Sequence, residues 1–309
     1  NDRDSESESS FNPLSPVFKL ANIATQTASQ IAKAAISQGF QTWDNPTRLI
    51  ELAQAGGLLT AASAAILTKL LVLPTDRKSI FKGKLGALKK VVWSEPLDLD
   101  LVKRIGKGMD ATVNDVLVAA VSGALRRYLQ AKGDPVKSGD MRAMVPVNLR
   151  NPKEGMKLGN QFALVYLNLP VSLIRPEERL IAVKRQMDVL KSSPEPMIVY
   201  QLLNFIGMLP GAIAEQATPW FSTKASAILT NVPGPRQTIY FAGKAMKRIL
   251  FWVPQSGQIG LGISVMSYAG TVSLGIVVDE SLTPDPEQIL EAFKAEFSEM
   301  AKYVEGKEN

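Results

Sequence analysis

The spacing of hydrophobic positions along the chain changes near residue 91. Before it, apolar residues recur three and four positions apart, which predicts amphipathic helices over 16–38 and 47–73. After it, stretches in which every second residue is apolar are interleaved with helical ones. Because helices alternate with strands, some of them linked as hairpins, the second part predicts an α/β fold of the α+β kind with a mixed sheet.

The clearest strands are 259–266 and 271–278, whose apolar residues share one face and whose short connection contains Gly270. The final helix is expected to start with Asp285 as its cap and Pro286 at its first position. Further strands are predicted at 91–96, 142–147, 162–169, 227–232 and within 239–253, and further helices at 98–107, 112–131, 176–192 and 196–221, the last broken near 207–210.

These patterns divide the chain into three segments. Residues 1–15 are expected to be a disordered acidic lead-in, since the first ten carry four acids, one base and almost nothing apolar. Residues 16–90 are expected to be a helical linker region, and 91–309 a globular lobe. The chain starts at Asn1 rather than Met and shows no signal peptide, so we expect it to be part of a longer sequence.

Two stretches of the linker bear on membranes. Residues 52–68 carry no charge, but they are few and rich in Ala, Gly, Ser and Thr, which predicts a buried or surface-lying helix rather than a span. Residues 69–90 carry seven bases and one acid. This excess is compatible either with a solvated linker or with a basic patch facing an anionic membrane.

Composition removes many kinds of chemistry. The 309 residues include no cysteine and no histidine, which excludes disulfides, thiol nucleophiles, Cys/His zinc sites and any histidine general base. The chain has no P-loop and no glycine-rich dinucleotide motif, and its bases lack the aromatic interleaving of a nucleic-acid surface. We therefore expect no metal, no cofactor, no nucleic-acid partner, and little acid–base catalysis by this chain alone.

A first candidate site lies at the start of the helix predicted over 112–131. Thr112 and Asp115 have the spacing of a capping box, and Asp115 also meets the positive end of the helix dipole. A structural cap accounts for both residues. Asn114 is less expected there, and an amide in the first turn can orient a loop or a ligand.

A second candidate follows the strand predicted over 227–232. The turn Asn231-Val-Pro233-Gly234-Pro235 is stiffened by its prolines, and its glycine permits a positive φ, so it is either a structural turn or the mouth of a tunnel. Residues 216–278 contain no acid. Their bases would attract phosphates, unless they are simply the few charges of a sheet-rich core: Lys224, Arg236, Lys244, Lys247 and Arg248.

Several motifs, in this order, resemble the bacterial-type wax ester synthase/acyl-CoA:diacylglycerol acyltransferase family. The resemblance runs from about residue 80 to the end, and it rests on the stretches 91–129, MVPVNLR (144–150), LGNQFALVYLNLP (158–170), 229–254 and the hairpin 259–279. It implies a two-lobed chloramphenicol-acetyltransferase-like fold, shared with condensation domains of peptide synthetases. The active site of that fold lies in a tunnel between the lobes.

The family's catalytic motif, His-His-x-x-x-Asp-Gly, is missing, because the chain has no histidine. In the family this motif lies in the first lobe, so the resemblance implies a fragment whose N-terminal lobe is absent. The other interpretation is a natural half-protein or an inactive relative. In either case the chain alone is expected to be inactive.

The resemblance implies part of an O-acyltransferase that moves a long-chain acyl group from acyl-CoA to a fatty alcohol or diacylglycerol. It implies a supporting role for Asn114 and Asp115, and a tunnel or CoA-binding role for Asn231, Pro233, Gly234, Arg236 and Lys244. We expect a cytoplasmic protein peripherally associated with an anionic membrane or lipid-droplet surface. Two alternatives stay open: a non-catalytic acyl-binding or partner lobe, and a condensation-type peptide synthetase lobe.

Overall fold

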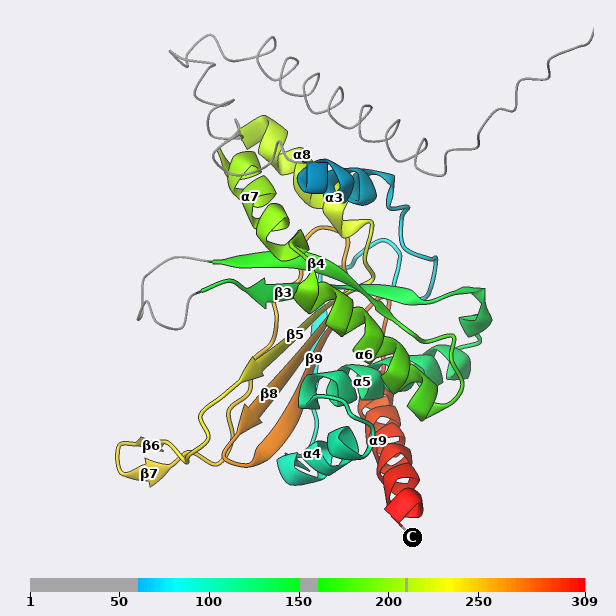
Figure 1. Ribbon diagram of the computed structural model, residues 1–309, viewed down its shortest axis with the longest axis vertical. Coiled ribbons are helices and arrows are strands. Elements are labelled where there is room, and N and C mark those ends of the chain that lie inside the picture. The colour runs from blue at the N-terminus through cyan, green and yellow to red at the C-terminus, as the bar shows by residue number, and fades with distance from the viewer. Residues whose placement is uncertain (1–60, 151–160, 209–210, 309) are drawn as a thin grey trace, which may run out of the picture. The chain divides into compact units, whose positions relative to one another are not determined.

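The computed structural model describes residues 61–150, 161–208 and 211–308 (Figure 1). The chain forms two units, Asn1–Leu73 and Pro74–Asn309. The lead-in expected at 1–15, the helix expected at 16–38 and most of the one expected at 47–73 lie outside the described residues. In the first unit the structure contains helix α3 (Ala61–Val72). Among the described residues, no helix combines the length and apolar character needed to cross a membrane.

The second unit is built on a seven-stranded mixed sheet, as the sequence predicts. The strand order is β1-β9-β8-β5-β3-β4, and the short strand β2 also pairs with β9. Strand β5 runs parallel to both of its neighbours, β3 and β8, and the other pairs are antiparallel. The bounds are β1 Lys89–Trp93, β2 Leu97–Asp98, β3 Met141–Asn148, β4 Phe162–Leu169, β5 Ala227–Pro233, β8 Leu261–Tyr268 and β9 Thr271–Asp279.

The β8–β9 hairpin shows why the alternation of its residues is informative. Leu261 faces Val278 across the pair, and the register continues to Tyr268 and Thr271. The two turn residues, Ala269 and Gly270, have φ of 46° and 83°. Positive φ at both central positions is the geometry that matches the twist of antiparallel strands. The predicted hairpin is therefore confirmed.

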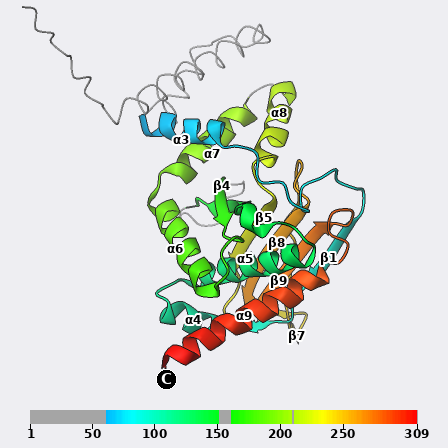
Figure 2. The same ribbon diagram turned by 90° about the vertical axis from the view of Figure 1, so that its right-hand side faces the viewer.

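Helices cover one face of this sheet (Figure 2). Helices α5 (Val113–Ala131) and α9 (Glu287–Glu308) lie side by side across the strands, with α4 (Leu99–Gly108) and α6 (Pro176–Ser192) packed beside them. Their apolar stripes and the inner faces of the strands form a single buried core. The break predicted near 207–210 separates α7 (Glu195–Gly207), which packs on β4, from α8 (Gly211–Ser222).

A buried ion pair joins three of the helices. Arg179 of α6 pairs with Glu296 of α9, and both are 1% exposed. Arg179 also donates to the carbonyls of Leu173 and Ile174, and Glu296 accepts a second bond, at 3.0 Å, from Arg127 of α5. Burial, reinforced by neighbouring arginines, lowers the pKa of Arg179 to about 10. Because these charges are paired and hydrogen-bonded, their burial is tolerated.

Residues 74–88 contain no helix or strand and belong to the second unit. Phe81 is fully buried, and Asp76 accepts hydrogen bonds from the backbone N–H of Arg142 and the hydroxyl of Ser226. Lys82 donates to two carbonyl oxygens of residues 222–223. The second unit therefore begins before residue 91, where the sequence pattern placed the start of the lobe.

The basic stretch 69–90 is largely engaged within the protein. Arg77 pairs with Asp134, Lys89 with Asp279, and Lys90 with Glu287. These contacts, with those of Lys82, differ from both interpretations offered by the sequence, a solvated linker and a basic patch turned to a membrane. We call the stretch 69–90 the strap. Four of its seven bases attach it to the sheet and to neighbouring loops: Arg77, Lys82, Lys89 and Lys90.

Candidate functional site

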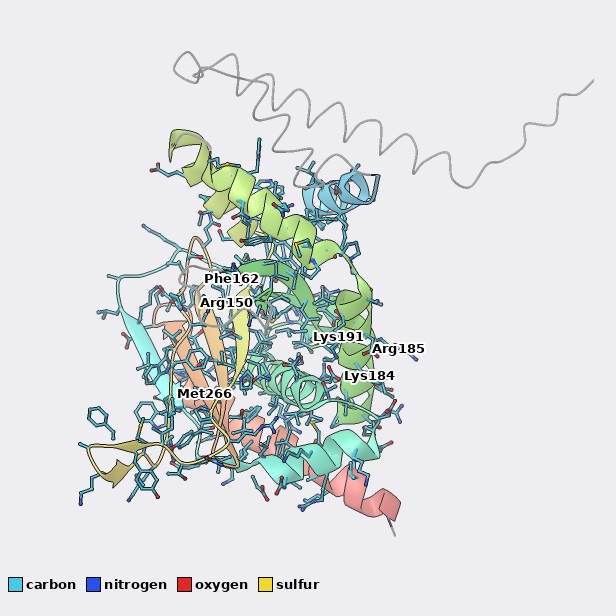
Figure 3. The ribbon with its side chains drawn as sticks, turned by 60° about the vertical axis from the view of Figure 1, so that its left-hand side comes forward. Arg150, Phe162, Lys184, Arg185, Lys191 and Met266 are labelled. Atoms are coloured by element: carbon cyan, nitrogen blue, oxygen red, sulfur yellow. The ribbon has the colours of Figure 1, made fainter. Side chains whose placement is uncertain are left out.

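Three parallel strands end at one edge of the sheet. Because β5 is parallel to β3 and to β8, the carboxyl ends of all three strands meet there, together with the start of β4. We call this the carboxyl edge. Arg150, after β3, lies beside Phe162, the first residue of β4 (Figure 3), and Met266 lies two residues before the end of β8. In open α/β sheets, ligands bind at the carboxyl ends of strands.

Helix α5 begins at this edge with the predicted capping box. The Thr112 hydroxyl accepts a hydrogen bond from the Asp115 N–H at 3.3 Å, and one carboxylate oxygen of Asp115 accepts from the Thr112 N–H at 2.8 Å. Asp115 is 1% exposed, and its other carboxylate oxygen, Oδ1, has no hydrogen-bond partner among the described residues. Asp115 therefore caps the helix and keeps one buried acceptor unused.

Asn114 and Asn231 meet at the carboxyl edge. The Asn231 side-chain amide donates to the Asn114 side-chain oxygen at 2.9 Å, although the two residues are 117 positions apart. Asn114 takes no part in the cap, so its amide is free to join the first turn of α5 to β5. This pair is partly buried. It brings together one residue from each of the two sequence candidates, a contact that neither motif predicts.

One base on α6, Lys184, approaches the start of α5, and the sequence pattern did not single it out. Lys184, Arg185 and Lys191 lie between the middle of α6 and its last turn (Figure 3). Lys184 lies 3.0 Å from Asp188 and 3.7 Å from Asp110. Its pKa is raised, first by the hydrogen bond to Asp188 and also by the charges of Asp110 and Asp115. Lys184 is therefore close enough to the start of α5 for the carboxylates of Asp110 and Asp115 to help raise its pKa.

Gly234 has a backbone conformation that differs from the expected one. It does not have a positive φ. Its N–H donates to the carbonyl of Ser267 at 2.9 Å, and a Cβ on Gly234 would stand 2.2 Å from that same oxygen. Glycine is required here because the turn after Pro233 approaches the end of β8 so closely. The turn is thereby fixed to the neighbouring strand.

Arg236 and Lys244 lie apart from the main sheet. Lys244 begins β7 (Lys244–Ala245), which pairs only with β6 (Tyr240–Phe241) in a small exposed hairpin, and Arg236 lies in the exposed segment leading to it. Of the other bases in the acid-free segment, Arg248 pairs with Glu95, and Lys224 lies over the ring of Trp220. The five bases thus do not form one anion site. In the residues that the structure describes, no cluster of side chains suitable for a metal ion is found.

The comparison with protein families identifies the larger part of this lobe. Residues 158–301 match the family model named WS/DGAT C-terminal domain. The chain carries a WS/DGAT C-terminal domain. Asn231, the turn that follows it and the β6–β7 hairpin lie inside the WS/DGAT domain, whereas Asn114 and Asp115 precede it.

Individual relatives carry names consistent with the WS/DGAT domain. A putative diacylglycerol O-acyltransferase of Mycobacterium tuberculosis is 31% identical over 71% of this chain and 45% of its own length. The O-acyltransferase WSD of Acinetobacter baylyi is 28% identical over 70% of this chain and 48% of its own. The chain thus spans about half the length of these relatives.

Solved structures confirm the predicted fold. The wax ester synthase/diacylglycerol acyltransferase from Marinobacter aquaeolei VT8 matches with a TM-score of 0.57 at 19% identity, covering 86% of this chain and 58% of that one. The epimerization domain of tyrocidine synthetase B matches with a TM-score of 0.54 at 12% identity, covering 88% of this chain and 61% of the other. The WS/DGAT domain therefore shares its fold with the peptide synthetase domains, as the resemblance implied.

Proposed function

We propose that this chain is the C-terminal part of an O-acyltransferase that transfers a long-chain acyl group from acyl-CoA to a fatty alcohol or a diacylglycerol. The WS/DGAT domain, together with the names of its relatives, supports the reaction class. The observation that carries the proposal is the Asn114–Asn231 pair, because it links the start of α5 to the WS/DGAT domain at the edge where a ligand is expected.

In the proposed reaction a base takes the proton of the alcohol, and the alkoxide oxygen attacks the thioester carbonyl. The new C–O bond forms, the C–S bond breaks, and the CoA thiolate leaves and takes up a proton. No histidine is present in the 309 residues, so the base is supplied by a polypeptide that this chain does not include. The role of this chain in the reaction is to hold the substrate in position relative to the base.

We assign this positioning role to Asn114, with Asn231 as its partner. The pair leaves the amide nitrogen of Asn114 and the side-chain oxygen of Asn231 without a hydrogen bond to any described residue. One donor and one acceptor therefore stay available at the carboxyl edge. Asp115, which keeps one acceptor oxygen unused beside them, supports the same first turn.

Two sets of bases are candidates for the phosphates of CoA. Arg236 and Lys244 are exposed on or near the hairpin, and Lys184, Arg185 and Lys191 lie on α6. Binding of CoA to the full chain, measured by calorimetry for Lys244→Glu and for Arg185→Glu, separates them. The set that binds the phosphates is the one in which charge reversal weakens CoA binding more.

The test of the function compares the chain alone with the chain joined to the part of the Acinetobacter baylyi relative that lies outside the matched region. We expect transfer from a long-chain acyl-CoA to a fatty alcohol or diacylglycerol by the joined protein. We expect the chain alone to be slower by a factor of about 10² to 10⁴, the usual contribution of a general base. Equal turnover by both would contradict the proposed division of labour.

A non-catalytic acyl-binding or partner role is the second candidate, the alternative that the sequence left open. It predicts that the joined protein binds acyl-CoA but transfers nothing.

We also propose peripheral association with anionic membranes or lipid droplets. Because four bases of the strap are engaged within the protein, we expect this binding to be weak and to disappear as salt is raised.

A further inference from the structure

Four charged side chains gather at the edge of the sheet opposite to the carboxyl edge, where the parallel strands β3 and β5 begin. Asp76 and Lys82 come from the strap, Arg142 is the second residue of β3, and Lys224 lies in the link between α8 and β5. We call these four residues the amino-edge cluster. Because β5 has seven residues, the cluster lies about 20 Å from the carboxyl edge.

Hydrogen bonds hold the amino-edge cluster together. The Asp76 carboxylate accepts from the backbone N–H of Arg142 at 3.0 Å and from its Nε at 3.3 Å. The N–H of Asp76 donates to the carbonyl of Thr223 at 3.0 Å, and Lys82 Nζ donates to the same oxygen at 2.9 Å. Lys224 follows Thr223 directly in the chain. The four charged groups therefore occupy one small region of the structure.

The charges of the cluster do not balance. Lys82, Arg142 and Lys224 are three bases and Asp76 is one acid, which leaves an excess of two positive charges. Lys224 is 4% exposed, and the side chains of Arg142 and Asp76 are 12% and 1% exposed. Burial lowers the pKa of Lys82 and of Lys224; the charge of Arg142 lowers both further, and for Lys82 the charge of Asp76 opposes this. Charges withdrawn from water need a counter-ion.

The cluster also contains unused hydrogen-bond donors. Arg142 Nη2 donates to the carbonyl of Pro74 at 2.8 Å, but Nη1 is buried and has no partner among the described residues. Lys82 donates to the carbonyls of Ser222 and Thr223, and an ammonium group has a third N–H. A guanidinium and an ammonium with unused donors are the groups with which proteins bind phosphate oxygens.

We propose that the amino-edge cluster binds a phosphate group through Arg142 Nη1 and the ammonium groups of Lys82 and Lys224. A phosphate with two negative charges balances the excess positive charge, and its oxygens accept from the unused donors. The source is free phosphate or the phosphate of a lipid headgroup. This site is separate from the carboxyl edge, so the inference goes beyond the proposed function. Because Lys82 belongs to the strap and Arg142 to β3, bound phosphate fastens the strap to the sheet.

The test measures binding of inorganic phosphate to the full chain by calorimetry, at an ionic strength kept constant with sodium chloride. We expect saturable binding that raises the melting temperature. Lys224→Met and Lys82→Met each remove one charge-assisted contact and should weaken binding by about tenfold or more. Asp76→Asn should strengthen it, because the acid that competes with phosphate is removed. The matched control is Lys294→Met on α9, an exposed lysine whose replacement should leave phosphate binding unchanged. Circular dichroism at the temperature of the titration establishes that each variant is folded.

Vesicles distinguish the two sources of the phosphate. Binding to phosphatidylcholine vesicles that contain phosphatidic acid, displaced by inorganic phosphate and weakened by Lys224→Met, identifies a lipid headgroup as the ligand. Phosphate binding without such vesicle binding identifies free phosphate.

Three results would overturn the inference. One is the absence of saturable phosphate binding. Another is binding that folded Lys224→Met and Lys82→Met leave unchanged, since a rise in melting temperature would then reflect only the general exclusion of phosphate from protein surfaces. The third is binding of CoA that Lys224→Met weakens as much as it weakens binding of phosphate, because the cluster would then belong to the substrate site.

Discussion

The helical face of the second unit and the carboxyl edge of its sheet differ in how a buried carboxylate is paired. On the helical face, both oxygens of Glu296 accept hydrogen bonds from arginines, although Arg179 Nε has no partner among the described residues. At the carboxyl edge, Asp115 has an unused buried oxygen, and the Asn114–Asn231 pair keeps a free donor and acceptor. Buried polar groups without a partner are few in native structures, and a role in binding or reaction is one reason for keeping a carboxylate oxygen unpaired.

The largest effect on stability should come from breaking the buried ion pair. Arg179→Met leaves the Glu296 carboxylate with only the partly exposed Arg127 as a partner, and an uncompensated buried charge costs about 3 kcal/mol or more. Urea denaturation measures the loss. The control is Arg175→Met, because Arg175 is 65% exposed in its pair with Glu178, so its replacement should lower stability far less. If Arg179→Met and Arg175→Met lost equal amounts of unfolding free energy, the buried pair would matter no more to stability than an exposed one.

Asn114→Ala should instead affect activity far more than stability. The variant loses one hydrogen bond to Asn231, worth about 1 kcal/mol, and regains a few tenths through helix propensity. In the joined enzyme kcat/KM should fall about 10²-fold, because misplacement of about 1 Å has an effect of that size.

The comparison for Asn114 is Thr112→Ala, which removes the cap and should cost about 1 kcal/mol of stability with little change in kcat/KM. If Asn114→Ala melts much earlier than Thr112→Ala while the folded protein keeps its kcat/KM, the amide is structural. The carboxyl edge would then resemble the helical face.

Acid should weaken the attachment of the strap through Asp279. Burial opposes ionisation of this carboxyl, but hydrogen bonds from Lys89, Ser281 and the Gly86 N–H outweigh it and lower its pKa to about 2. A lowered folded-state pKa stabilises the fold above the unfolded value near 4, and that stabilisation, of order 2 kcal/mol, is lost as the pH falls from about 5 to 2. The melting temperature should therefore fall as the pH is lowered over this range. Asp279→Asn should melt at a lower temperature at pH 7, and its melting temperature should depend less on pH.

The smallest effect should come from the hairpin turn. Ala242 has a positive φ, which costs a residue with a Cβ about 1 kcal/mol, and asparagine is favoured at this position of such turns. Ala242→Asn should therefore raise the free energy of unfolding by a few tenths to about 1 kcal/mol, measured in urea. An unchanged or lower value would show that the turn is not strained at Ala242.

Local patterns predicted most elements of the second unit. The β8–β9 hairpin, the Thr112–Asp115 capping box and the break between α7 and α8 each depend on residues close together in sequence. Apolar alternation over 239–253 correctly indicated short strands but not the irregular path from Met246 to Val253. That path packs over Gly262, where a Cβ would meet Val253, and no local pattern records it.

The candidate site was predictable only in pieces. Thr112, Asn114 and Asp115 were recognisable from their spacing, but the bond from Asn114 to Asn231 depends on the order of strands in the sheet. The same holds for Lys184, whose importance arises from its approach to Asp110 and Asp115. Conversely, Arg236 and Lys244 stood out by charge alone, and the structure places them on or beside an exposed hairpin instead.

The pairing of β1 with β9 has a consequence for how the protein is made. Lys89 and Asp279, which face each other in this pair, are separated by 190 positions. During synthesis β1 therefore has no β9 to pair with until about 190 further residues have been made. Such long-range closure slows folding and leaves the strand open to wrong partners in the meantime. The arrival of β9 thus determines when β1 is protected from aggregation.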